Sequence, residues 1–122
     1  MSYFIIPNSV LVGSIIYRVT QDSGEWVSFE YKHKINGFLG HTDHEHAIIY
    51  LNPKCPPDVT RLTLWHEILH ALCQVVAGRP DWLNLGEDQN ARDESVIQRL
   101  ESPTLLVLRD NPQLVTYLTS AA

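Results

Sequence analysis

The sequence has little of what marks secreted, membrane or nucleic-acid-binding proteins. Only two cysteines, Cys55 and Cys73, occur in 122 residues. They are too few for a disulfide framework, so we expect reduced thiols. No stretch approaches the roughly 18 uninterrupted apolar residues that a membrane-spanning helix needs. Fourteen acidic residues outnumber nine basic ones, for a formal charge of -5, which argues against binding to a phosphate backbone.

Targeting and repeat signals are also missing. Residues 1–7 contain no positively charged segment, so we predict no secretory signal peptide. Internal repeats and low-complexity tracts are absent. A length of 122 residues with 44% hydrophobic residues is typical of one globular domain with its own core. We therefore expect a single cytoplasmic domain over residues 1–122, with no nucleic-acid or membrane partner.

Strand signals dominate the first half of the chain. Residues 9–20 are rich in β-branched side chains and are interrupted by Gly13, which predicts one or two short strands with a bend. Residues 26–34 alternate in part and favour a strand, with a short helix as the alternative. Residues 37–43 predict a strand, a turn and a strand. Residues 46–52 predict a further strand, which ends at the prolines after it.

Helical periodicity replaces the strand pattern in the second half. Apolar residues recur at helical spacing over residues 58–77. A second helix is predicted over residues 91–100 and, beyond an interruption at Pro103, a third segment over residues 105–109. Asn111 and the proline after it predict the start of a last helix. Strands followed by helices indicate an α+β fold.

The first helix carries the sequence His66-Glu67-Ile68-Leu69-His70. Two histidines four residues apart share a helical face, about 5–6 Å apart at Cβ, so both rings can reach one metal ion. Glu67 can then hold a metal-bound water and accept its proton. Apolar neighbours predict a helix buried nearly all round, where such polar groups are costly unless they bind metal. The alternative is a polar stripe that faces solvent.

The third metal ligand is left open by the spacing. A catalytic zinc takes three protein ligands and keeps one position for water. No histidine follows His70, so the third ligand is a downstream carboxylate or an upstream histidine. Glu94, in the first turn of the second helix, has a longer side chain than Asp93 and is preferred, with Glu101 as a third choice. Acids in a first turn also occur because they complement the helix dipole. The side chains expected to hold this helix against the first are Val96, Ile97 and Leu100.

Four further histidines precede the motif: His33, His41, His44 and His46. The last three could form a second metal cluster, but a solvated polar turn is the favoured interpretation, because alternate residues of a strand or turn do not all face one side. One of the four could reach the zinc cleft and donate to the tetrahedral oxyanion, and the sequence does not choose among them. Cys73 follows His70 by three residues and could be a ligand, but a packed thiol is the commoner role for a cysteine there.

The HEILHAL sequence resembles the active helix of minimal zincins. More narrowly, it resembles the small phage- and prophage-borne metallopeptidase-like proteins related to the ImmA/IrrE group. Residues 40–51, 93–100 and 109–115 are similar to the same family, so the resemblance covers about residues 36–118. It implies a minimal zincin-like domain, in which a small antiparallel or mixed sheet packs on a central helix and two to three C-terminal helices follow.

The resemblance also implies a gluzincin-type site. His66, His70 and Glu94 would bind Zn²⁺, and Glu67 would be the general base in hydrolysis of a protein or peptide, in the host cytoplasm if the chain is phage-encoded. On the same ground, the strand over residues 46–52 is expected to be a sheet edge that binds an extended peptide. Two other functions stay open. They are a protein-binding module on a zincin fold, with weak or no catalysis, and a zinc hydrolase of non-peptide substrates.

Overall fold

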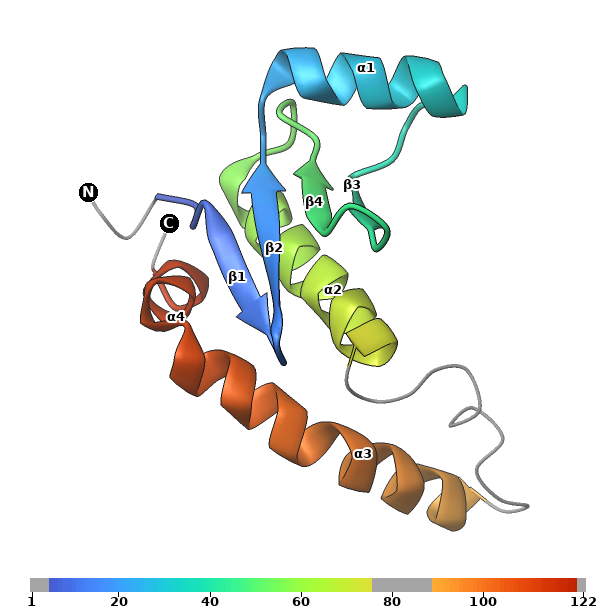
Figure 1. Ribbon diagram of the computed structural model, residues 1–122, viewed down its shortest axis with the longest axis vertical. Helices are drawn as coiled ribbons and strands as arrows, with labels where there is room; N and C mark the ends of the chain where they lie inside the picture. Colours follow the sequence, from blue (N-terminus) through green and yellow to red (C-terminus); the bar gives the residue numbers. More distant parts are fainter. Residues whose placement is uncertain (1–4, 76–88, 121–122) are drawn as a thin grey trace.

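The structure of the chain is a computed structural model that describes residues 5–75 and 89–120, with only the backbone described for residues 89–95 and 97. The elements of this part are β1 (Ser9–Val12), β2 (Ile15–Thr20), α1 (Ser23–His33), β3 (Gly40–Asp43), β4 (Ile48–Leu51), α2 (Pro57–Val75), α3 (Gln89–Asp110) and α4 (Pro112–Leu118). Strands precede most of the helices, and the predicted α+β class is confirmed (Figure 1).

The strands form one mixed sheet in the order β1-β2-β4-β3. β1 and β2 are an antiparallel hairpin that bends at Gly13, whose φ is 61°, as the β-branched run predicted. β2 pairs with β4 in parallel, and β3 pairs with β4 in an antiparallel sense. The prediction that the strand over residues 46–52 is an edge is wrong, because β4 lies between β2 and β3. The edges of the described sheet belong to β1 and β3.

The segment preferred as a strand over residues 26–34 is helix α1. Asp22 caps its start by accepting a hydrogen bond from the Glu25 N–H at 2.9 Å. Trp26 and Phe29, three residues apart, are buried on one face, while Val27 is exposed. The partial alternation read as a strand was therefore one face of an amphipathic helix.

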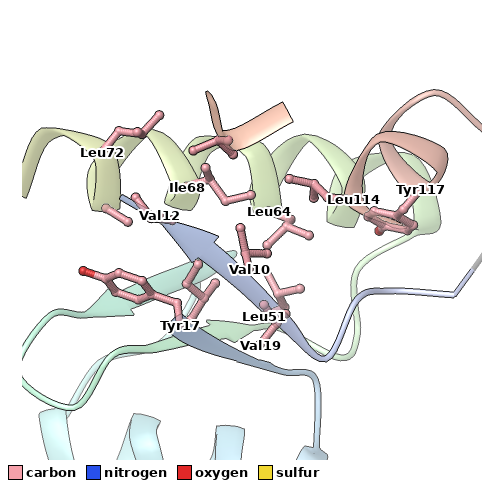
Figure 2. Close-up of a cluster of buried hydrophobic side chains, with 13 residues drawn as sticks. Val10, Val12, Tyr17, Val19, Leu51, Leu64, Ile68, Leu72, Leu114 and Tyr117 are labelled. Atoms are coloured by element: carbon pink, nitrogen blue, oxygen red, sulfur yellow. The ribbon is translucent and has the colours of Figure 1, made fainter. Parts of the chain in front are cut away.

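Helix α2 lies across one face of the sheet and supplies the centre of the core (Figure 1). Figure 2 shows Leu64 and Ile68 directed toward Val10 on the sheet, while Leu114 and Tyr117 of α4 close one end of the cluster. The prediction of a helix buried nearly all round is wrong. Every fourth residue along one row is exposed: Leu62, His66, His70 and Gln74.

Helix α3 runs without a break through Pro103, where the sequence predicted an interruption. Proline cannot donate a hydrogen bond to the carbonyl four residues before it, which here is that of Arg99. The next residue, Thr104, donates through its hydroxyl to a different carbonyl, that of Leu100. The principal described contacts of α3 are with β1 and α4, and Val107 enters the core. Residues 91–100 had been expected to pack on α2 instead.

The last helix begins at Pro112, as predicted, and the residue before it has a different role from the expected cap. Asn111 makes no side-chain capping bond. Its amide accepts from the Leu11 N–H at 2.9 Å, and donates to the carbonyls of Leu11 at 3.0 Å and Val107 at 2.7 Å. Asn111 thus pairs with the outer edge of β1 as a strand would. In the described part of the chain, no helix combines the length and the apolarity needed to cross a bilayer.

Candidate metal centre and catalytic cleft

The two histidines of the motif converge on the exposed row of α2. Their Nε2 atoms lie 3.2 Å apart, and the rings meet edge to face at 75°. Two nitrogens bound to one tetrahedral zinc at 2.0–2.1 Å would be about 3.3 Å apart. The pair therefore already has the spacing that a shared ion requires. The same distance also allows one neutral ring to donate a hydrogen bond to the other.

Glu67 differs from the two exposed histidines of the motif in being buried, at 6% exposure. The Thr42 hydroxyl donates to its Oε1 at 2.7 Å, and lies 3.1 Å from the Glu67 carbonyl. The other oxygen, Oε2, is 4.0 Å from His66 Nε2. One carboxylate oxygen is thus anchored and the second faces the histidine pair. A general base beside a metal-bound water needs this arrangement.

Gly40 allows β3 to come this close to α2. A Cβ at this position would lie 2.7 Å from Thr63 Cγ2 and 3.0 Å from the Tyr50 carbonyl oxygen. The first distance is shorter than real Cβ contacts, and the second is tighter than most of them, so any larger residue would push the strand from the helix. The glycine therefore sets the separation at which Thr42 can reach Glu67.

A cavity of about 580 Å³ lies between β3 and α2. All three polar side chains of the motif line it. The full lining comprises Phe38, Leu39, Gly40, His41, Thr42, His44, Leu62, Thr63, His66, Glu67 and His70. A volume of this size is typical of a small-molecule or side-chain binding site. The histidine pair is thus exposed in a cleft rather than on a flat surface.

Two of the four upstream histidines reach this cleft, and two do not. His41 and His44 line it, whereas His33 packs against Phe29 with ring centroids 4.8 Å apart. His46 Nδ1 instead pairs with Asp43 Oδ2 at 2.9 Å. The three histidines over residues 41–46 therefore serve different surroundings and do not form one metal cluster.

The two cleft histidines are held differently. His44 Nδ1 lies 3.3 Å from the hydroxyl of Tyr17, a residue that is 1% exposed. Burial raises the pKa of Tyr17, so this hydroxyl keeps its proton. His41 stacks on Phe29 at 4.9 Å. Burial lowers the pKa of His41, although the nearby charge of Glu67 opposes this.

The preferred third ligand falls outside the described side chains. Glu94 and Asp93 are on the first turns of α3, where only the backbone is described. Glu101 is exposed on the same helix, and Cys73 is half-buried on α2. Among the described side chains, no third histidine, cysteine, aspartate or glutamate joins His66 and His70 in a group that could hold a metal ion. Glu94 stays a prediction.

Sequence reasoning did not assign Leu62 and Thr42 to the cleft that they line, nor Tyr17 to its contact with His44. Leu62 precedes His66 by four residues, so helical spacing alone could have placed it beside the pair. Thr42 meets Glu67 across 25 residues of chain, and Tyr17 meets His44 across 27. Such contacts depend on strand order, which no local pattern encodes.

Comparisons of the chain with protein-family models, with curated proteins and with solved structures find no match. The fold class is α+β, and membership of a particular fold family remains a proposal. Support for a function therefore comes from the chemistry of the cleft itself.

Proposed function

We propose that the chain is a zinc-dependent metallopeptidase on a minimal zincin-like domain, related to the ImmA/IrrE group. The observation that carries the proposal is the convergence of His66 and His70 at 3.2 Å beside a buried Glu67 that Thr42 holds in the same cavity. His66, His70 and Glu94 would hold the metal. Zinc in such a site supplies a Lewis acid and lowers the pKa of its water to about 7.

Glu67 is the general base in this proposal. Its Oε1 is fixed by Thr42, so Oε2 is the oxygen that accepts the proton of the attacking water. The same carboxyl then gives that proton to the leaving amine. Because the carboxylate is buried and anchored, little reorganisation is needed between the two transfers.

His44 is the candidate hydrogen-bond donor to the developing oxyanion. When the protonated Tyr17 hydroxyl donates to Nδ1, the ring proton of a neutral His44 is on Nε2. A donor to the carbonyl oxygen, whose negative charge grows in the transition state, contributes most there. Of the four histidines that the sequence left open, we propose His44 for this role because it lines the cleft and contacts the Tyr17 hydroxyl through Nδ1.

The substrate backbone is proposed to pair with the edge of β3. The Asn52 N–H donates to the Leu39 carbonyl at 2.9 Å, which sets alternate residues of β3 in hydrogen-bonded pairs with β4. The main-chain groups of Gly40 and Thr42 then point away from β4. An extended peptide can add to this edge, next to the histidine pair. This replaces the strand over residues 46–52 as the proposed binding edge.

The test is Glu67→Gln in the zinc-loaded protein. We expect zinc content to stay at the wild-type level and hydrolysis of a mixed peptide library to fall by about 10²–10⁴-fold, because the base is removed and the ligands are kept. Glu45→Gln, on the exposed turn after β3, is the matched control and should change neither value. A fully active Glu67→Gln protein would end the proposal.

The ligand set is tested separately by metal analysis. Zinc content should fall in His66→Ala and His70→Ala, and in Glu94→Gln but not Asp93→Asn. A protein that binds zinc yet cleaves no peptide would instead be the binding module. Zinc-dependent cleavage of esters without peptide cleavage would identify the non-peptide hydrolase.

A further inference from the structure

One end of the cleft is apolar and exposed. Phe38, Leu39 and Leu62 are 45%, 51% and 70% exposed, yet all three line the cavity that holds the histidine pair. Single exposed apolar residues are ordinary, but a group of large ones at one cavity is typical of a ligand-binding surface. Covering these three side chains lowers the free energy only when the partner is apolar, because the gain comes from apolar surface removed from water.

This apolar end is continuous with the reaction centre. Leu62 occupies the same exposed row of α2 as His66 and His70, one turn earlier. Phe38 and Leu39 lead directly into β3, and the close approach of Gly40 to Thr63 places the start of that strand beside the same turn of α2. A peptide on the edge of β3 would therefore pass over both the apolar end and the histidine pair.

The charges of the residues that line the cavity also favour an apolar side chain as the group that binds there. Among the described residues that line the cavity, the one carboxylate is Glu67, and no lysine, arginine or aspartate is present. A charged side chain placed against Phe38, Leu39 and Leu62 would lose hydration without gaining a charged or polar partner from these three side chains. An aliphatic or aromatic side chain would lose nothing and would cover Phe38, Leu39 and Leu62.

We propose, resting on the peptidase function above, that this end is a specificity pocket for a bulky apolar side chain of the substrate. Antiparallel addition to β3, the more stable pairing, makes the peptide run opposite to the strand. Its residues near Phe38 and Leu39, which precede β3, then lie C-terminal to the scissile bond. The pocket accordingly selects leucine- or phenylalanine-like residues on that side.

The experiment uses the zinc-loaded full chain and peptide mixtures that differ at one fixed position, holding Leu, Phe, Asp or Lys. Cleavage sites are read by mass spectrometry. We expect at least about tenfold higher kcat/KM when Leu or Phe follows the scissile bond than when Asp or Lys does. Indifference to that residue, or selection only on the N-terminal side, would overturn the pocket while leaving the peptidase intact.

Two exposed leucines, one in the cleft and one outside it, test the role of Leu62. Leu62→Ser should lower kcat/KM for the leucine peptides about tenfold and leave zinc content unchanged. Leu105, 67% exposed on α3 and outside the cleft lining, supplies the control, and Leu105→Ser should change neither value. Equal effects of the two substitutions would contradict the assignment.

Binding gives a readout that does not need turnover. In zinc-loaded Glu67→Gln, fluorescence anisotropy should show leucine peptides binding about tenfold more tightly than the matched aspartate peptides, and Leu62→Ser should remove the difference. If the wild-type protein cleaves no peptide, the ratio of the affinities for leucine and aspartate peptides still tests the pocket. A preserved preference supports the pocket while the peptidase function fails, and equal binding overturns the pocket.

Discussion

The two edges of the sheet are treated in opposite ways. At the β1 edge, the Asn111 amide pairs with both peptide groups of Leu11, and α3 and α4 pack alongside (Figure 1). At the β3 edge, the peptide groups of Gly40 and Thr42 point away from β4, and both residues line the cleft that holds His66 and His70. Unpaired edges invite unwanted association, so proteins usually cover them. Among the described residues, the edge far from the motif is covered and the edge beside the motif is not.

The two edges therefore have different roles: the β1 edge stabilises the fold, and the β3 edge positions the candidate catalytic residue. Val10 and Val12 of β1 are fully buried in the core with Val107 and Leu114, so the closed edge supports the fold. The buried side chain of β3, Thr42, instead holds the catalytic candidate Glu67. Substitutions at the two edges should therefore produce different defects, and three of them test this separation.

The largest effect is expected at the open edge, in the turn that follows β3. His44→Ala should lower kcat about 10²–10³-fold, the cost of one oxyanion donor, with KM and the unfolding midpoint little changed. Tyr17→Phe should lower kcat less, because it removes only the hydroxyl that orients the ring. His46→Ala is the control, since that ring pairs with Asp43 outside the cleft. Equal losses of kcat in His44→Ala and His46→Ala would show that the turn has only a structural role.

At the closed edge, Asn111→Ala should lower the free energy of unfolding by about 2 kcal/mol, because it leaves the Leu11 peptide groups and the Val107 carbonyl without their partner. Urea denaturation measures this. Gln113→Ala, exposed on α4, should be neutral. Zinc content should be unchanged in both, and a loss of zinc in Asn111→Ala would contradict the separation of the two edges.

Gly40→Ala should cost about 1–2 kcal/mol from overpacking against Thr63 and the Tyr50 carbonyl. It should also reduce turnover, since Thr42 moves from Glu67, while zinc binding by α2 persists. In contrast, an added Cβ in Gly24→Ala of α1 meets only the side-chain carboxylate of Asp22, at 3.1 Å, and the substitution gains helix propensity. Turnover unaffected by Gly40→Ala would show that the spacing between β3 and α2 is not used in the reaction.

Elements governed by local spacing could be predicted from the sequence. The hairpin at Gly13 and helix α2 follow from β-branched runs and helical period, and both are present. Helix α1 was misread because its buried pair, Trp26 and Phe29, also fits a partial alternation. The continuity of α3 through Pro103 depends on packing of its C-terminal half on β1 and α4, which overrides the local signal.

The candidate site likewise has features that local spacing predicts and features that it does not. The convergence of His66 and His70 is a property of four-residue spacing on one helix, so the sequence could predict it. The burial of Glu67, the contact with Thr42 and the choice of His44 depend on β3 being the edge strand. Strand order arises from long-range pairing and cannot be read from a local pattern.

The bridge between Leu11 and Asn111 spans 100 residues. During synthesis, Leu11 of the hairpin of β1 and β2 emerges 100 residues before Asn111, the residue that pairs with its outer edge. The ribosome must therefore add all of these residues before that edge is paired. Nascent or truncated chains would therefore present a bare strand to chaperones and to one another.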